Sequence, residues 1–425
     1  MDVNAPALVH VCSFYRTNPV HERLFTELHA QTGLQQIVVV PVKKPVPARS
    51  AESAPFGRVV QLHCLDLATS ASSRHRGRRI VRALRRHGLW DELAALEVVR
   101  VHAHSAYMDG FAAACIARHA GAGYCLTFRA TDTDFCFRYR PWATLFMRRI
   151  ARGAHALLTI SRGDLDRVAD RLSLDRGRVQ WLGSGVDDDC AAGALLRKPH
   201  RATARTTFVT TGKRGYPYKR VDLTIAACDA AAQQLGLEDW TLRVLGMTSE
   251  DYRRTHGRRA GAPPPGERVE FLGRVSSRTE LLAILREASQ FVLPSRETFG
   301  IVFLEAVSQC TPIVWLRDYA VEGVFDGTWV GEPARSQALE HVVGAIVATA
   351  RRSGGALGPF DRNPVSGLGW DSLARRYRRA VLDDRAATGV ADGAAARGPD
   401  DPSRPRRRAR FAGRYSDRSA RRNRR

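Results

Sequence analysis

The sequence from Phe291 to Val314 reads FVLPSRETFGIVFLEAVSQCTPIV and predicts a short strand, a turn and a buried helix. The strand corresponds to Phe291–Leu293, and the helix begins near Phe299, after a Pro-Ser turn and an acidic loop. Apolar residues occupy six of the seven positions from 301 to 307, which leaves no polar face for water. A helix that is apolar all round is normally buried in a protein core.

Two glutamates give this segment its chemistry. Glu305 lies within the apolar helix, where an unpaired carboxylate would cost several kcal/mol, so it must meet a hydrogen-bond donor, a cation or a ligand. Glu297 precedes Gly300, a residue that lets another molecule approach the backbone. Free N–H groups at a helix start bind anions, and carboxylates accept hydrogen bonds from hydroxyl groups. The segment fits a sugar nucleotide, and a structural pair between Glu305 and an arginine is the simpler alternative.

The rest of the chain alternates strand-like apolar runs with helical patterns. In the first half, runs such as Gln36–Val42 and Val98–His102 alternate with helical patterns such as Val20–Thr32. A second series begins at Thr207–Thr211, after a weakly patterned stretch from 188 to 206 that we interpret as a linker. This alternation predicts an α/β fold with parallel, doubly wound sheets that bind ligands at the carboxyl ends of their strands. The expected parts are a first domain in 1–190, a second in 205–365, a final helix in 366–385 and a disordered arginine-rich tail in 386–425.

Composition limits the compartment and the partners. The 425 residues contain no apolar run near the roughly 18–20 residues that span a bilayer, and no secretory signal pattern at the start. Eight cysteines are scattered without a C-x-x-C pair, which favours a reducing cytoplasm. The net charge of +23 comes in part from twelve arginines between Arg397 and Arg425 and from seven between Arg74 and Arg86. Both clusters fit either an anionic membrane surface or plain solvated surface, and no motif for nucleic-acid binding accompanies them.

Glu297 and Glu305 form the Glu-x7-Glu pattern of retaining, family 4-like glycosyltransferases of the GT-B fold, which this chain resembles from about residue 8 to 382. Phe299, Gly300 and the apolar helix between the glutamates match the family in kind. The resemblance implies two Rossmann-like domains that face one cleft, an acceptor-binding first domain and a donor-binding second one. It also implies a last helix, Trp370–Leu382, that crosses back to the first domain.

The resemblance also implies a set of donor-binding residues. The segment from Thr211 to Asp222 is similar to the family's G-R-x5-K-G-x-D loop, with Lys213 and Arg220 replacing its arginine and second glycine. The two lysines of this loop would neutralise the donor diphosphate, because a leaving diphosphate gains negative charge as the glycosidic bond breaks. Glu297 would bind the donor sugar, Glu305 the ribose, and the N–H groups after Glu297 the phosphate. The full predicted donor set is Gly212, Lys213, Lys219, Glu297, Phe299, Gly300, Ile301 and Glu305.

The first domain supplies the remaining candidates. Arg129 stands where many relatives have a histidine near the reacting sugar, and it joins Glu297, Lys219 and Lys213 in the predicted catalytic set. Acceptor-side candidates are Arg16, Asn18, His104 and Asp132, of which Asp132 either caps a turn and holds Arg129 or supports catalysis. His102 and His104 have metal-ligand spacing but no further ligand in range, and Asp132-Thr133-Asp134 is an isolated Asp-x-Asp, so we predict no metal.

Two loops depart from the family pattern. The family commonly has a glycine-rich turn after the first strand, but this chain has the sequence SFYRTNP from Ser13 to Pro19. Relatives often have a G-G-x-x-E turn where this chain has Leu316-Arg317-Asp318-Tyr319. Without glycine the backbone approaches a donor less easily.

The predicted function is a retaining, metal-independent, hexosyltransferase-like enzyme that moves a sugar from a nucleoside diphosphate to an acceptor hydroxyl without a cofactor. The resemblance favours cell-surface or extracellular polysaccharide synthesis, in the cytoplasm or at the inner face of the membrane, with a lipid-linked acceptor among the candidates. The alternative is a catalytically silent GT-B protein that binds anionic membrane or nucleic acid through its arginines. We favour the enzyme and expect no nucleic-acid partner. The donor base, the donor sugar and the acceptor stay open.

Overall fold

The computed structural model describes residues 6–17, 20–43, 50–64, 73–194, 205–257, 266–325, 327–353 and 360–383. The predicted tail, 386–425, lies outside these ranges, as does Asn18. All eight cysteines are free thiols, and every one except the half-buried Cys115 is buried. No helix in the described ranges combines the length and the apolarity that a membrane crossing requires.

The first half is an eight-stranded sheet in the order β3-β4-β2-β1-β5-β6-β7-β8, in which only β3 is antiparallel to its neighbour. Its central strands are continuous apolar runs because helices cover both faces of a parallel sheet. The strands are β1 (Ala7–Val11), β2 (Gln35–Val42), β3 (Ser50–Ala54), β4 (Gly57–His63), β5 (Val98–Ala103), β6 (Gly123–Phe128), β7 (Ala156–Thr159) and β8 (Val179–Trp181).

The helices of this half are α1 (Val20–Thr32), α2 (Ser73–Arg86), α3 (Leu89–Ala95), α4 (Gly110–His119), α5 (Phe137–Tyr139), α6 (Pro141–Arg152), α7 (Asp164–Leu172) and α8 (Asp188–Ala192). A π-helical turn, η3 (Thr131–Cys136), leads into α5. The β3–β4 hairpin is not among the elements expected from the sequence, and the stretch predicted as a linker begins with a short helix, α8.

The second half is a six-stranded, fully parallel sheet in the order β11-β10-β9-β12-β13-β14. The strands are β9 (Thr206–Thr211), β10 (Trp240–Leu245), β11 (Val269–Gly273), β12 (Gln290–Leu293), β13 (Ile313–Leu316) and β14 (Gly331–Ala334). The helices are α9 (Val221–Leu235), α10 (Ser249–His256), α11 (Arg278–Glu287), α12 (Ile301–Ser308) and α13 (Leu339–Ser353). Counted within this half, the strand order is 3-2-1-4-5-6, the order of a dinucleotide-binding Rossmann sheet. The α/β, two-sheet prediction is confirmed.

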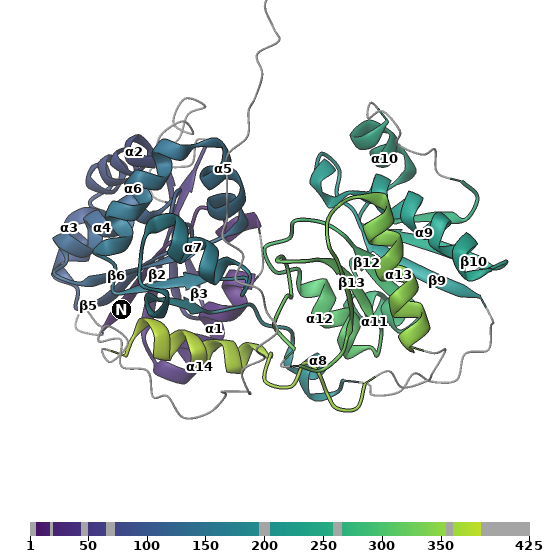
Figure 1. Cartoon of the computed structure of the whole chain (residues 1–425). Coiled ribbons are helices and arrows are strands. Elements are labelled where there is room, and N and C mark those ends of the chain that lie inside the picture. Colours follow the sequence, from purple (N-terminus) through teal and green to yellow (C-terminus); the bar gives the residue numbers. More distant parts are fainter. Residues whose placement is uncertain are drawn as a thin grey trace, which may run out of the picture. The chain divides into compact units, whose positions relative to one another are not determined.

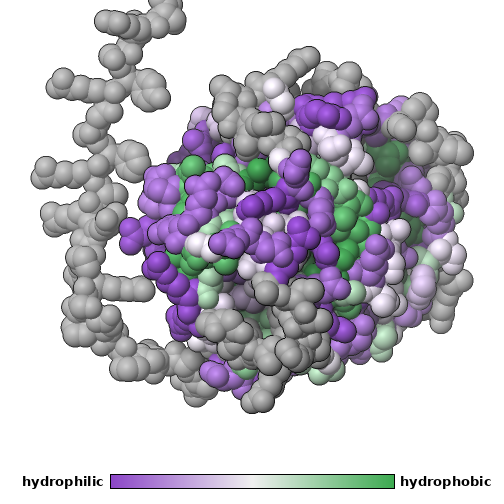
Figure 2. Space-filling view, turned by 90° about the vertical axis from the view of Figure 1, so that its right-hand side faces the viewer, coloured by the Kyte–Doolittle hydropathy of each residue, from purple (hydrophilic) through white to green (hydrophobic). Residues whose placement is uncertain are grey.

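The last helix, α14 (Trp370–Val381), returns to the first half and packs on α1 (Figure 1). The Tyr377 hydroxyl lies 2.6 Å from Nδ1 of His102, and the Gln31 amide donates to the Asp371 carboxylate at 2.9 Å. The described residues belong to one compact unit. The face in Figure 2 is mostly hydrophilic, with hydrophobic residues visible between the polar ones.

Candidate active site

Each sheet has one point where the strand order reverses, and ligands bind such sheets at the carboxyl ends of the two strands beside that point. In the first sheet these strands are β1 and β5, which end before Cys12 and His104. In the second sheet they are β9 and β12, which end before Gly212 and Pro294. The loops that carry most of the predicted site residues therefore begin at these switch points.

The start of α12 has the form that an anion site needs. Gly300 has a φ of 74°, in the left-handed region, and a Cβ there would lie 2.8 Å from Cδ2 of Phe303. Only glycine fits this position without strain. The helix begins two residues later than the sequence suggests, at Ile301, and is buried from Phe303 to Ser308. The Phe303 N–H donates to the Gly300 carbonyl oxygen at 2.9 Å, and the N–H groups of Ile301 and Val302 come before the first full turn, where a helix leaves its donors to caps or ligands.

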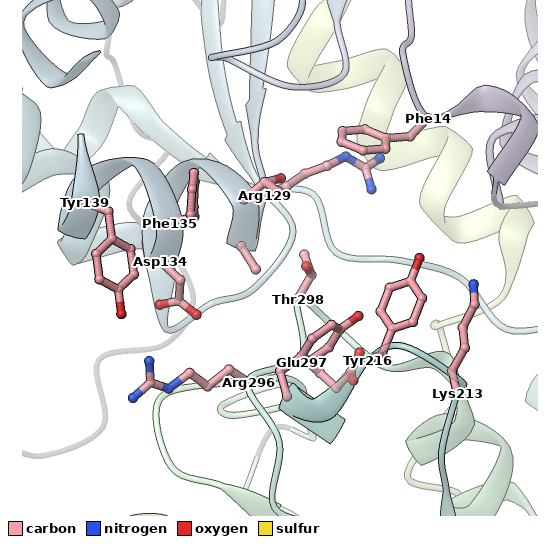
Figure 3. A pocket seen from close by; sticks show the side chains of 13 residues that line it. Phe14, Arg129, Asp134, Phe135, Tyr139, Lys213, Tyr216, Arg296, Glu297 and Thr298 are labelled. Carbon is pink, nitrogen blue, oxygen red and sulfur yellow. The ribbon is translucent and has the colours of Figure 1, made fainter. Parts of the chain in front are cut away.

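Two cavities meet at this helix start. The inner cavity has a volume of about 420 Å³ and takes its walls from both halves, including His21, His104, Lys219, Phe299, Gly300 and Ile301. The outer cavity has a volume of about 590 Å³ and is lined by aromatic and charged side chains, including Phe14, Asp134, Phe135, Tyr139, Lys213, Tyr216, Tyr218 and Arg296 (Figure 3). Arg129, Glu297 and Thr298 line both cavities.

Glu297, on the common wall, forms an ion pair with Lys219 of the inner cavity, with Nζ of Lys219 at 2.5 Å from Oε1 of Glu297. The Ser295 hydroxyl donates to the same carboxylate oxygen at 3.1 Å. Both charged side chains are mostly buried, so each depends on the other or on a ligand for compensation. Lys213 lies apart, in the outer cavity, where its ammonium stacks on the Tyr216 ring at 4.6 Å from the centroid. The two lysines therefore face different cavities.

Two other positions of the β9–α9 loop support its backbone. Arg220 has a φ of 54°, in the left-handed region that glycine adopts most easily. Its guanidinium pairs with Asp222 at 3.3 Å. Gly212 lines neither cavity, and a Cβ there would approach Val221 and Met247 at 3.0–3.2 Å. Its absent side chain allows the loop to pack closely, which is a structural role.

Glu305 does not reach either cavity. It is buried, and its Oε1 accepts a hydrogen bond from Nη1 of Arg278 at 3.0 Å. The same Arg278 nitrogen lies 2.8 Å from Asp187, in the turn before α8. Burial raises the pKa of Glu305, and the nearby Arg278 charge offsets part of this rise. Arg278 is the cation that the burial of Glu305 requires. This structure therefore contains the structural glutamate–arginine pair that the sequence offers as the simpler alternative to ribose binding.

Arg129 is held at the junction of the cavities by Asp132, as the sequence suggests, and by two further groups that the sequence did not connect to it. Its Nε donates to the His104 carbonyl oxygen at 2.7 Å, and its Nη2 lies 2.6 Å from Nε2 of His21. Because a guanidinium only donates, His21 must accept through an unprotonated Nε2. The Asp132 carboxylate accepts from the Arg129 backbone N–H at 2.9 Å and from Ser105 at 2.9 Å. Asp132 lines neither cavity, so it caps the turn that carries Arg129.

The expectation that His102 and His104 have no further ligand in range is wrong. His10 forms a group of potential ligand atoms with both of them, and Cys12 and His21 form another with His104, each group within 4.8 Å. Protein groups already engage these atoms: Nδ1 of His10 lies 3.0 Å from Nε2 of His104. His102 has Tyr377 at one ring nitrogen and Thr127 at the other, at 2.6 Å and 2.7 Å. Hydrogen bonds to other protein groups account for the positions of these side chains without an ion. The absence of a metal stays a prediction.

The loop after β1 is tied to the first half instead of being open to a donor. Ser13 hydrogen bonds through both its hydroxyl and its backbone N–H to the buried Asp109 carboxylate. The buried Arg76 donates to the Ser13 hydroxyl at 2.8 Å. Burial raises the pKa of Asp109 to about 6. Arg16, a predicted acceptor-side residue, pairs with Glu52 on the surface and lines neither cavity, so its acceptor role stays a prediction.

The turn after β13 keeps a glycine-like backbone without glycine. Asp318 and Ala320 have φ values of 67° and 51°, a conformation that costs a side-chain-bearing residue roughly 1–2 kcal/mol. Ala320 donates its N–H to the Glu297 carbonyl oxygen at 3.1 Å. The Tyr319 hydroxyl donates to Asp134, in the first half, at 3.0 Å. The turn therefore braces the Glu297 loop against the first half.

Sequence reasoning missed several residues of the site, chiefly Arg278, His21, Arg296 and the aromatic lining of the outer cavity. Their positions in the sequence carry no motif. The fold and the site define a protein with two Rossmann-like sheets. Its site lies at their switch points and combines cations with a carboxylate that can accept hydrogen bonds from hydroxyl groups.

Comparisons with known proteins assign this architecture to a family. Residues 23–189 match the family described as Glycosyltransferase Family 4, and residues 205–347 match Glycosyl transferases group 1. No match was found among curated proteins. A sucrose-phosphate synthase from Thermosynechococcus elongatus is similar in fold, with a TM-score of 0.65, 16% identity, and coverage of 88% of this chain and 98% of that one. An α,α-trehalose-phosphate synthase from Burkholderia xenovorans is also similar in fold, with a TM-score of 0.61, 13% identity, and coverage of 88% of this chain and 98% of that one. Anabaena HepE in complex with UDP-glucose has a TM-score of 0.56, 11% identity, and coverage of 90% of this chain and 96% of that one.

The two family matches lie on the two halves in the order that the architecture requires. The chain belongs to the group 1 glycosyltransferases and has the GT-B fold.

Proposed function

We propose that this glycosyltransferase is a retaining, metal-independent enzyme that transfers a hexose from a nucleoside diphosphate to an acceptor hydroxyl. The observation that carries the proposal is the Lys219–Glu297 pair in front of the α12 start. Lys219 and the free N–H groups of α12 would hold the donor phosphates, because both attract anions. Glu297, released from Lys219, would accept hydrogen bonds from the sugar hydroxyls.

The acceptor would enter through the outer cavity and meet the donor at the wall that the two cavities share. Arg129 is the cation that the first half presents on this wall, and it would stabilise the charge that the diphosphate gains as it leaves. Lys213 would attract an anionic group in the outer cavity. In same-face transfer the leaving phosphate oxygen takes the acceptor proton, so the proposal needs no protein nucleophile.

Glu305 has a second role in the proposal only if a ribose displaces Arg278 from it. Its absence from the lining of both cavities and its pairing with Arg278 favour a structural role, and the family pattern favours the ribose. Further parts of the proposal are cytoplasmic localisation at the inner membrane face, a lipid-linked acceptor and polysaccharide synthesis. They rest on the basic surface and on the family resemblance.

The first test identifies the donor. A thermal-shift screen of UDP-, GDP- and ADP-sugars, repeated with EDTA, should reveal one stabilising nucleotide with or without chelator. UDP-glucose is the first choice because the similar HepE structure holds it. With that donor, the anomeric configuration of the product, read by proton NMR, should equal that of the donor sugar. An inverted product would refute retention, and a loss of binding in EDTA would refute metal independence.

The second test is the variant Glu297→Gln. It should lower kcat by about 100-fold or more, since the removed charge no longer organises the donor site, while the melting temperature changes little. The matched control is Glu340→Gln, on the exposed start of α13. Equal turnover in the two variants would remove Glu297 from the proposed mechanism.

A further inference from the structure

The first half carries an unusual concentration of exposed apolar side chains. Among the described residues, half of the exposed large hydrophobic side chains lie in one short segment: Phe135, Tyr139, Trp142 and Leu145, with exposed fractions of 47%, 59%, 60% and 71%. We call these four residues the apolar patch. Single exposed apolar residues are ordinary, but a contiguous group marks an interaction surface.

The helix α6 presents part of this patch on its outer face. Trp142, Leu145, Arg149 and Arg152 are exposed and follow one another at helical spacings of three and four residues, so they share one side of the helix. The opposite side, with Ala143, Met147 and Ile150, packs into the core. The solvent side of this helix is thus apolar at its beginning and cationic at its end. An ordinary surface helix presents polar residues there.

The apolar patch borders the outer cavity. Phe135 and Tyr139 belong to both, and their rings lie 5.7 Å apart (Figure 3). Arg138 stacks on Tyr139 at 5.4 Å from the ring centroid. A molecule held at the patch therefore lies at the edge of the cavity that Arg129 and Glu297 line.

A cationic helix lies close to the patch. The exposed arginines of α2 lie three or four positions apart, except for one adjacent pair: Arg74, Arg78, Arg82, Arg85 and Arg86. None of these five arginines forms an ion pair with another described residue. Helix α2 packs on α4, and α4 packs on α6, so the three helices cover one side of the sheet (Figure 1). Neither α2 nor α6 contains an acidic residue.

We propose that the apolar patch and the arginines of α2 and α6 dock the enzyme on an anionic lipid bilayer, from which the outer cavity receives an acceptor anchored by an apolar chain. This inference deepens the proposed function and depends on it only for the acceptor. Aromatic side chains and leucine enter the interfacial layer, while arginines bind the phosphates of lipid head groups. A soluble protein partner would not need a field of arginines without acidic partners beside the apolar patch.

The experiment uses the full chain and vesicles of phosphatidylcholine with or without about one third phosphatidylglycerol. The patch variant combines Trp142→Gln and Leu145→Gln, residues outside both cavities. The control variant combines Leu272→Gln and Leu339→Gln, which are 39% and 42% exposed in the second half. All three proteins keep the same arginine-rich tail, so differences between them report the apolar residues alone.

We expect the wild type and the control variant to sediment with the anionic vesicles and the patch variant to bind at least tenfold more weakly, because each buried apolar side chain contributes more than a factor of ten. Brominated lipid should quench the fluorescence of Trp142 in the wild type and in the control variant. Equal vesicle binding of the patch and control variants, or patch-dependent self-association without vesicles, would overturn the proposal.

The acceptor part has its own readout. With the donor that the thermal-shift screen identifies, the patch variant should no longer transfer sugar to a lipid-linked acceptor in vesicles. It should still bind the nucleotide sugar in the thermal-shift assay. If no nucleotide sugar binds any of the proteins, the proposed function fails while the vesicle result still stands. If vesicle transfer is unchanged in a variant that has lost vesicle binding, the acceptor assignment fails.

Discussion

At the level of single residues, the site contains charges that pair with other groups of the protein. Lys219 neutralises Glu297, and His21 accepts from Arg129, so each prospective ligand-binding group is held in position before a donor arrives. Such preorganisation reduces the reorganisation that the reaction would otherwise require. In the proposed mechanism, a donor diphosphate replaces Glu297 as the partner of Lys219, and the released carboxylate then lies beside the sugar.

The role of His21 can be tested because it touches Arg129 and acts through it. His21→Ala should lower kcat by about tenfold or more and leave the donor Kd nearly unchanged, since the guanidinium loses one of its two fixed side-chain and backbone acceptors. His21→Gln should recover part of the rate, because its amide oxygen can accept the same hydrogen bond. Steady-state kinetics and calorimetric donor titration measure both. A purely structural role would lower thermal stability in both variants without this difference in kcat.

At the level of helices and strands, the start of α12 depends on one glycine. Gly300→Ala should destabilise the protein by roughly 1–2 kcal/mol, from the left-handed conformation and the contact with Phe303, and should weaken binding of the nucleoside diphosphate. The control is Gly344→Ala in α13, where a Cβ meets no atom within 4 Å. That change should stabilise the helix by roughly 0.5–1 kcal/mol. Denaturant unfolding and calorimetry measure both, and equal behaviour of the two variants would contradict the assignment.

The pair that joins α11 and α12 decides between the two roles considered for Glu305. As a structural pair, Arg278→Ala and Glu305→Ala should each destabilise the protein by roughly 1–3 kcal/mol, and the double variant should be less destabilised than their sum. The Kd for the donor should then change little in either single variant. If Glu305 binds the ribose, only Glu305→Ala weakens the donor. A double-mutant cycle of unfolding free energies, with donor titrations, separates these results.

At the level of the whole molecule, the buried histidine cluster links stability to pH. Burial lowers the pKa of His10 to about 3 and those of His102 and His104 well below the ordinary value. Between pH 6.5 and about 3 the unfolded chain therefore binds protons that the folded one does not, and stability falls as pH falls. Each histidine adds about 1.4 kcal/mol per pH unit to this slope. Urea unfolding from pH 6.5 to 4.5 should show a slope for His10→Gln that is shallower by about that amount. Parallel slopes would contradict a neutral His10.

How much of the site is predictable from the sequence depends on how far apart its parts lie along the chain. Glu297 and the helix start at Gly300 are near neighbours, so their local pattern is enough to indicate an anion site. The βα alternation likewise predicts two parallel sheets, because each apolar run is a local property. Arg278 and Glu305 are separated by 27 positions, His21 and Arg129 by 108, and no local pattern connects them.

Three features of the protein arise only when the chain is folded. The histidine at position 10 meets His104 from another strand, because β1 and β5 are neighbours in the sheet. Arg16 has the charge of an acceptor ligand, but the path of its loop directs it to Glu52. Trp142 and Leu145 are large apolar residues, and the packing of α6 decides that they face the solvent.

The amino-acid sequence alone was sufficient for the class of fold, the two switch-point loops and the combination of carboxylate and lysine that an anionic sugar donor requires. Periodicity, glycine and local charge suffice for these because they act over a few residues. Folding in three dimensions settled which charges meet, which residues line a cavity and which apolar side chains stay exposed. Those outcomes depend on contacts between distant segments, and the strand order and helix packing that create such contacts are properties of the folded chain.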